Sequence, residues 1–195
     1  ADWEPAAYDW RLSLPDLLNK GTERGGKIFY EESTSTPYIE QTLRALASSS
    51  KTKKVTIIAH SNGGLLAKAL IEKLGASEAK NLVDAVIFVG VPQSGAPQAV
   101  GGLLFGYGQA LPRDDCSQLF LVGSLCSSLA SRAAARSLAE HSPMAYHLLP
   151  SDAYFASAQD PIHSVASFTG SHEYQKEQQA YGATIDDFSE LSDFL

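Results

Sequence analysis

Two apolar runs in the first half of the chain predict the strands of a parallel β-sheet. The first covers residues 55–59 and the second residues 83–91, and both are rich in valine and isoleucine. Such continuous runs are typical of strands that are covered on both faces. Between the two runs, a helical spacing of apolar residues predicts a helix that begins near Gly63 and ends at Gly75. Its apolar positions are Leu65, Leu66, Ala69 and Leu70.

The residues before this strand–helix–strand unit predict one further helix and a hairpin. Thr36 and Pro37 fit the N-cap and the first position of a helix. Residues 19–36 contain three glycines around a short strand-like run, which indicates a loop or hairpin. Residues 1–18 predict a loop with an aromatic anchor and a short amphipathic turn. The apolar face of the predicted helix consists of Ile39, Leu43, Leu46 and Ala47.

The pattern changes near residue 101, after which no further buried strand is predicted. The fold class is therefore α/β, with a sheet-containing core at residues 1–100 and a mostly helical region at residues 101–195. Four segments of the second region predict helices or short helices with loops: residues 119–125, 130–138, 142–150 and 184–195.

Composition and charge narrow the classes of function. The 195 residues are 44% hydrophobic and 19% charged, which is ordinary for a globular protein, and the formal net charge is −7. Without a lysine and arginine cluster, tight nucleic-acid binding is disfavoured. No apolar run approaches the roughly 20 residues of a membrane span. Cys116 and Cys126 are either one disulfide or two buried thiols, and their spacing does not indicate a metal site. No cofactor is predicted.

A serine lies in the turn between the first predicted strand and the helix. Residues 59–63, Ala-His-Ser-Asn-Gly, differ from the Gly-x-Ser-x-Gly nucleophile elbow by an alanine in the first glycine position. The outer positions need small residues because strand and helix approach closely, and Gly64 adds another. Such a turn presents Ser61 as a nucleophile for acyl transfer, with the Asn62 backbone N–H as one donor to the oxyanion. The alternative is an ordinary turn that contains a serine.

Four segments together resemble the α/β-hydrolase superfamily, and within it the lecithin:cholesterol acyltransferase-like group of lipases and acyltransferases. They are Tyr-Asp-Trp-Arg at residues 8–11, the turn at residues 59–64, the strand end at residues 88–95 and the segment at residues 147–155. The resemblance implies a partial α/β-hydrolase core with Ser61 as nucleophile. It also implies that the region after Pro92 is a cap over an acyl-chain site.

The same resemblance implies a triad in the order Ser, Asp, His, with Asp and His on loops after two further strands. Because no such strands are predicted after residue 100, the matching Asp and His are expected beyond Leu195. The second oxyanion donor is expected on an earlier loop, which the residues before Tyr8 do not provide. Within the chain, the pair Asp160 and His163, or His172 beside Glu173, is the less favoured alternative.

Other chemically suggestive residues have structural interpretations that we favour. Ser94 fits a Ser-Gly turn better than a second nucleophile, and the segment at residues 8–11 fits an Asp–Arg pair with an aromatic anchor better than a substrate contact. His60 is expected to point away from its neighbour Ser61 on a tight turn. His141 and His147 are expected on the surface or in the cap.

The sequence therefore predicts a serine hydrolase or acyltransferase that acts on lipid or other carboxylic esters through an acyl-enzyme on Ser61. One alternative is a non-catalytic hydrolase-like binding module. Another is a lipid-binding cap fragment, which requires an exposed apolar patch at residues 103–105. A lipid or ester substrate is the expected partner, and a membrane surface is a further candidate. The remaining chain or a partner subunit is expected to complete the sheet.

Overall fold

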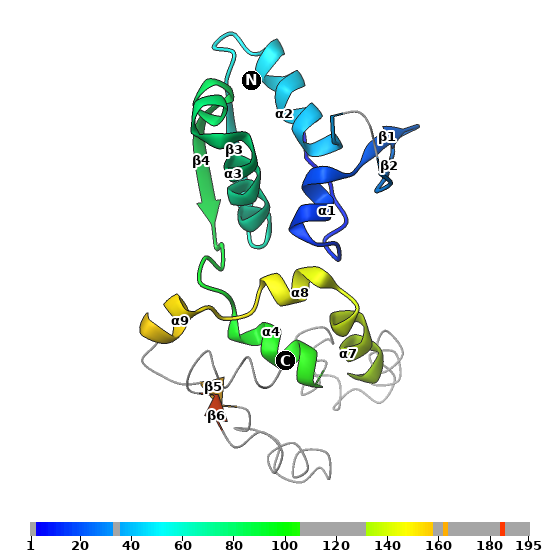
Figure 1. Cartoon of the computed structure of the whole chain (residues 1–195), viewed down its shortest axis with the longest axis vertical. Coiled ribbons are helices and arrows are strands. Elements are labelled where there is room, and N and C mark those ends of the chain that lie inside the picture. The colour runs from blue at the N-terminus through cyan, green and yellow to red at the C-terminus, as the bar shows by residue number, and fades with distance from the viewer. Residues whose placement is uncertain (1–2, 33–35, 106–131, 158–161, 164–183, 186–195) are drawn as a thin grey trace, which may run out of the picture. The chain divides into compact units, whose positions relative to one another are not determined.

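The chain forms two compact units, which are described separately here (Figure 1). The first unit comprises residues 1–93 and 142–147, and the second comprises residues 94–141 and 148–195. The assignment of residues 1–100 to a hydrolase core and residues 101–195 to a cap stays a prediction. The structure is a computed structural model that describes residues 3–32, 36–105, 132–157, 162–163 and 184–185. The predicted helix at residues 119–125 and both cysteines lie outside these ranges.

A two-stranded parallel sheet with its crossover helix is the centre of the first unit. Strand β3 (Val55–His60) is followed by helix α3 (Gly63–Leu82) and strand β4 (Val83–Val89), as the apolar runs predict. The strands pair in parallel, with Ile58 opposite Ile87. Helix α3 packs against both strands and lies over one face of the sheet in Figure 1. The predicted α/β class, a small parallel sheet flanked by helices, is confirmed.

Among the described residues, one face of the sheet is left uncovered, whereas the apolar runs alone are typical of strands that are covered on both faces. Along β3, Val55, Ile57 and Ala59 are at least partly buried, whereas the alternate residues are exposed. Ile58 keeps 71% of its surface accessible to solvent, and Ile87 of β4 keeps 48%. The physical reason is that the described helices of this unit pack on one face only. Successive strand residues point to opposite faces, so half of an entirely apolar run faces solvent.

Three further helices complete the core of the first unit. They are α1 (Leu14–Asn19), α2 (Tyr38–Ser49) and α8 (Pro143–His147). Helices α1 and α2 each contact α3. The fully or nearly buried residues of this core are Leu17, Leu18, Tyr38, Ile39, Leu43, Leu66, Leu70 and Met144. The segment that contains Met144 therefore belongs to the first unit, although it lies about 50 residues further along the chain.

The start of α2 and the end of α3 differ slightly from the boundaries predicted from the sequence. The N-cap of α2 is Pro37 rather than Thr36, because Pro37 is extended and the Tyr38 N–H donates to the Gly21 carbonyl at 2.9 Å. Gly75 ends the first part of α3 as predicted, with φ 73°. A second helical stretch then follows it up to Leu82, so the connection to β4 is shorter than expected. The hairpin prediction is confirmed by β1 (Thr22–Arg24) and β2 (Lys27–Phe29), which pair antiparallel.

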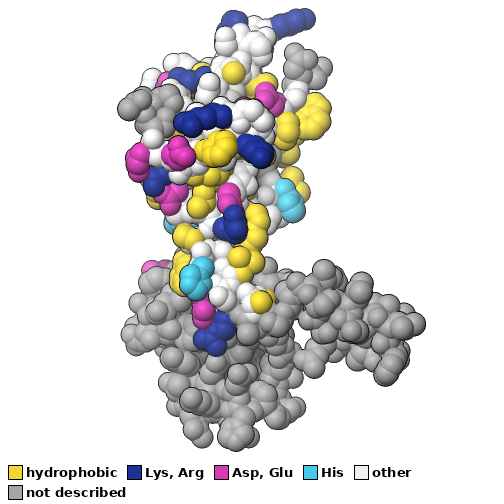
Figure 2. Space-filling view, turned by 90° about the vertical axis from the view of Figure 1, so that its right-hand side faces the viewer, with side chains coloured by type: hydrophobic (Ala, Val, Ile, Leu, Met, Phe, Trp, Pro, Cys, Tyr) yellow, Lys and Arg dark blue, Asp and Glu magenta, His cyan; other side chains and the backbone are white. Residues whose placement is uncertain are grey.

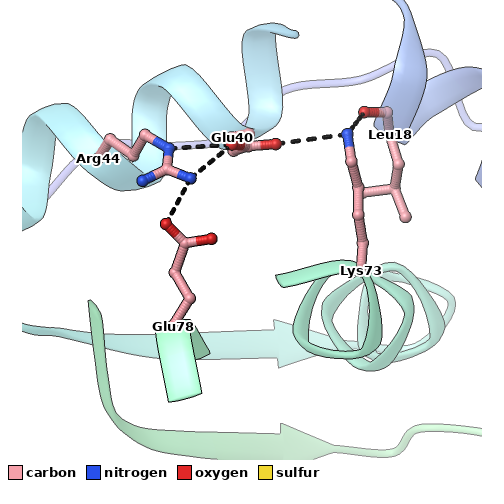
Figure 3. A network of polar contacts seen from close by, with 5 residues as sticks. All are labelled: Leu18, Glu40, Arg44, Lys73 and Glu78. Atoms are coloured by element: carbon pink, nitrogen blue, oxygen red, sulfur yellow. Dashed lines mark hydrogen bonds and ion pairs between the residues drawn. The ribbon is translucent and has the colours of Figure 1, made fainter. Parts of the chain in front are cut away.

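A polar network joins α1, α2 and α3 at the edge of this core (Figure 3). Arg44 of α2 donates to Glu40 one turn earlier and pairs with Glu78 of α3, both at 2.7 Å. Lys73 of α3 pairs with the other Glu40 oxygen at 3.3 Å and donates to the Leu18 carbonyl of α1. Glu40, whose side chain is 14% exposed, is therefore the shared acceptor of two cations from two helices.

The second unit contains helices and one short strand pair among its described residues. Helices α4 (Pro97–Phe105) and α7 (Arg132–Glu140) pack together, and α9 (Asp152–Ser157) follows. Residues 184–185, predicted as the start of a helix, instead form β6 (Thr184–Ile185), which pairs with β5 (Ile162–His163). Leu103 is only 6% exposed, so it does not contribute to the surface patch that a lipid-binding cap requires.

Candidate active site

Ser61 occupies a single strained position between β3 and α3. Its φ of 52° lies in the left-handed region, and it is one of two non-glycine residues with positive φ among those described. Such a backbone costs on the order of 1–3 kcal/mol and persists only where the surrounding structure fixes it. Here the Ser61 N–H donates to the Val89 carbonyl at 3.0 Å, and the Ser61 carbonyl accepts from the Gly64 N–H at 3.0 Å. The residue is thus held by the neighbouring strand and by the first turn of the helix.

Asn62 is the N-cap of α3, with φ −60° and ψ −20°. The first N–H groups of a helix have no partner within the helix and lie at the positive end of its dipole. Among the described residues, no acceptor contacts the Asn62 N–H. The side-chain oxygen of Asn62 does not cap the helix either, but accepts a hydrogen bond from the Tyr8 hydroxyl at 2.8 Å.

The close approach of strand and helix falls at Gly64, not at Gly63. A Cβ on Gly64 would lie 2.2 Å from Val91 Cγ2 and 2.8 Å from Val91 Cβ. A Cβ on Gly63 would meet only the Tyr8 hydroxyl, at an ordinary 3.5 Å. The small residue that the turn requires is therefore the one directly against the segment after β4.

The loop at residues 8–11 is held at three points. Besides the Tyr8 contact, the Asp9 N–H donates to the Tyr30 hydroxyl at 3.1 Å, and the Met144 N–H donates to the Arg11 carbonyl at 3.4 Å. Asp9 and Arg11 form the expected ion pair through two contacts of 2.8 and 2.6 Å. The hydrogen bond from Arg11 lowers the pKa of Asp9. Trp10 is 46% exposed, so the aromatic anchor of this loop is Tyr8.

The described histidine side chains make no hydrogen bond to Ser61 within the first unit. His60 is exposed on β3, and His147 Nε2 accepts from the Leu14 N–H at 3.4 Å. In the second unit, His141 Nδ1 lies 2.7 Å from the Ser137 carbonyl. Asp160, His172 and Glu173 lie outside the described residues, and only the backbone of His163 is described. The general base that a Ser61 nucleophile needs is thus not assigned by these contacts.

Ser94 lies in a tight loop of the second unit. Its carbonyl accepts from both the N–H and the hydroxyl of Ser151 at 3.0 Å. The adjacent Gly95, at φ 95°, lies against the chain at residues 149–150, where a Cβ would approach the Leu149 carbonyl to 2.3 Å. These contacts agree with the structural interpretation of Ser94.

The described residues show no feature of a strongly charged surface, a membrane span or a metal site. On the face shown in Figure 2, basic and acidic side chains of the described residues are interspersed. No described helix has the length and apolar character needed to cross a bilayer. The described residues also contain no group of three histidine, cysteine or carboxylate side chains that could hold a metal ion.

Comparison with known proteins gives one match. The family model described as lecithin:cholesterol acyltransferase matches residues 3–192, which is nearly the whole chain. No curated protein and no solved structure matches the chain. The match includes the loop at residues 8–11, the turn at Ser61 and the segment around Ser94.

Proposed function

Because the chain belongs to the lecithin:cholesterol acyltransferase family, whose members are of the α/β-hydrolase lipase and acyltransferase type, we propose that it transfers or hydrolyses acyl groups of lipid esters through an acyl-enzyme on Ser61. The family supports the lipid acyltransferase or esterase class. The identity of the nucleophile is our proposal. The observation that supports it most is the left-handed backbone of Ser61 at the junction of a parallel strand and a helix N-terminus.

The proposed reaction begins with attack of Ser61 Oγ on the ester carbonyl carbon. A base takes the hydroxyl proton, and the carbonyl oxygen becomes an oxyanion that accepts from the Asn62 N–H. Collapse of this intermediate breaks the ester C–O bond, and the alcohol leaves with the proton. Water or a second alcohol then attacks the acyl-enzyme and releases Ser61. The Asn62 N–H, which has no acceptor among the described residues, lies at the positive end of α3 and is suited to the donor role.

The test is covalent labelling of the protein at its full natural length with a fluorophosphonate probe, followed by mass spectrometry. We expect labelling on Ser61, and we expect Ser61→Ala to abolish both labelling and hydrolysis of p-nitrophenyl esters. Ser94→Ala is the matched control, because Ser94 also follows a strand but lies in a turn held by Ser151; this variant should label normally. Labelling that survives Ser61→Ala would refute the nucleophile assignment. A properly folded wild-type protein without labelling would favour the alternative of a binding module.

We also propose that further polypeptide, from the same protein or from a partner subunit, covers the outer face of the sheet. Ile58, Ile87 and Val89 are exposed by 71%, 48% and 48%. Apolar side chains side by side on two strands form a continuous surface that soluble proteins usually cover. Lipid substrates follow from the family, and contact with a membrane surface remains part of the proposal.

A further inference from the structure

The side chain of Asn62 is used differently from that of most N-cap asparagines. An asparagine at this position normally accepts from a backbone N–H two or three residues later, which satisfies one of the free donors of the helix. In α3 this bond is not formed. Asn62 Oδ1 instead accepts from the Tyr8 hydroxyl at 2.8 Å, across 54 residues of sequence. The residue next to the proposed nucleophile is therefore tied to a distant loop.

Tyr8 is a well-placed anchor for this contact. The loop that carries it is held by two bonds of neighbouring residues: the Asp9 N–H donates to the Tyr30 hydroxyl, and the Met144 N–H donates to the Arg11 carbonyl. Burial, and secondly the nearby Tyr30, raises the pKa of Tyr8, so its hydroxyl stays protonated and can donate at neutral pH. The hydroxyl also lies beside Gly63, at the start of the helix.

The backbone around Ser61 gives this contact a consequence for the reaction. The direction of the Asn62 N–H is set by the peptide plane between Ser61 and Asn62, next to a residue at an unfavourable φ of 52°. A hydrogen bond that fixes the Asn62 side chain restricts rotation of this peptide plane. On the basis of the function proposed above, we propose that Tyr8 is a positioning residue that holds the Asn62 N–H in the direction in which it can donate to the oxyanion.

Tyr8→Phe in the protein at its full natural length tests the proposal, because it removes only the hydroxyl that donates to Asn62. We expect kcat for p-nitrophenyl esters and the rate of fluorophosphonate labelling to fall by about tenfold, because a misdirected donor loses part of its effect on the transition state. A residue that acts only by positioning the oxyanion donor should leave KM nearly unchanged. Tyr30→Phe is the matched control. It removes another partly buried hydroxyl that holds the same loop through Asp9 but does not contact Asn62. Its loss of kcat should therefore be smaller than that of Tyr8→Phe, and adding Asn62→Ala should not cancel it.

A double-mutant cycle with Asn62→Ala separates positioning from general damage. If Tyr8 acts through the Asn62 side chain, the double variant should be no slower than Asn62→Ala alone. Multiplicative losses, or a Tyr8→Phe variant with wild-type kcat, would overturn the proposal. Should Tyr8→Phe fold poorly by circular dichroism, Asn62→Ala tests the same contact from its other side, and unchanged kcat there would also overturn it. These outcomes are distinct from failure of the proposed function, which Ser61→Ala alone reveals.

Discussion

At the scale of single residues, the tightest constraint near Ser61 is the contact of Gly64 with Val91. We predict that Gly64→Ala lowers the free energy of unfolding by roughly 1–3 kcal/mol, as overpacking of a closed site does. The added methyl group would lie within 2.8 Å of three Val91 atoms, including the rigid Cβ. Chemical denaturation of the variant measures the effect.

Two companion variants show whether this contact is the cause. Gly63→Ala should be neutral or stabilising by a few tenths of a kcal/mol up to about 1 kcal/mol, because its methyl group has room and alanine favours a helix. Combining Gly64→Ala with Val91→Ala should restore part of the lost stability. Equal losses at Gly63 and Gly64 would contradict the assignment of the close approach to Gly64.

Features that depend on neighbouring residues could be predicted from the sequence, whereas contacts between distant residues could not. The motif at residues 59–63 predicts the strained serine, because a strand, a tight turn and a helix leave few backbone conformations for the residue between them. The contacts of Asn62 with Tyr8 and of Gly64 with Val91 span 54 and 27 residues. Neither can be derived from local patterns, because each depends on how separate elements pack. The tyrosine before the Asp–Arg pair is visible in the sequence, but its hydrogen-bond partner, Asn62, cannot be inferred from the sequence.

At the scale of helices, Glu40 connects α2 to α3 through Arg44 and Lys73. Burial favours the neutral form of Glu40, but hydrogen bonds from these cations outweigh it and lower its pKa below the ordinary value of 4.5. A lowered pKa stabilises the folded state above that value, and the benefit is lost as the pH falls below it. We predict that Glu40→Gln destabilises the protein by about 1.5 kcal/mol at pH 7. The difference from wild type should narrow below pH 4.5 in denaturation experiments.

Glu78→Gln is the control for this prediction. Glu78 pairs with Arg44 at the same 2.7 Å distance, but its side chain is 43% exposed, and among the described residues it has one ion-pair partner instead of two. Exposed ion pairs typically contribute less than about 1 kcal/mol. A loss at Glu78 as large as that at Glu40, or a Glu40 effect independent of pH, would show that the network does not act through the buried carboxylate.

The elements themselves were largely predictable from sequence, whereas their environment was not. The helical spacing of apolar residues predicts α2 and α3, and continuous apolar runs predict β3 and β4. The hydrophobic pattern did not predict that Ile58 and Ile87 face solvent, because a β-branched run has the same appearance whether one or both faces are covered. It also missed that Thr184 and Ile185 pair as a strand, since two residues are too few to show a period.

At the scale of the whole molecule, the outer face of the sheet should govern solution behaviour. We predict that the purified chain binds a hydrophobic dye such as anilinonaphthalene sulfonate and self-associates as its concentration rises. Ile58→Lys should reduce both effects, because a charged residue interrupts the apolar surface. With Ile58 71% exposed, the substitution should change stability by no more than about 0.5 kcal/mol. Fluorescence and sedimentation velocity provide the measurements.

Thr56→Lys is the matched substitution on the same strand. Thr56 is also exposed and lies two residues before Ile58, so it projects from the same face. It adds the same charge without removing an apolar side chain, and it should leave more dye binding than Ile58→Lys. A wild-type chain that stays monomeric without binding dye would contradict the proposal that further polypeptide covers this face.

The position of Met144 has a consequence for how the protein is made. Its side chain, 1% exposed, fills the core formed with Leu17 and Leu18, yet it follows residues 94–141, which belong to the other unit. Polypeptides leave the ribosome from the N-terminus and usually fold domain by domain in that order. Here the first unit cannot close its core until much of the second has been synthesised. An apolar site in the core of the first unit therefore stays unfilled on the nascent chain until residue 144 has been synthesised.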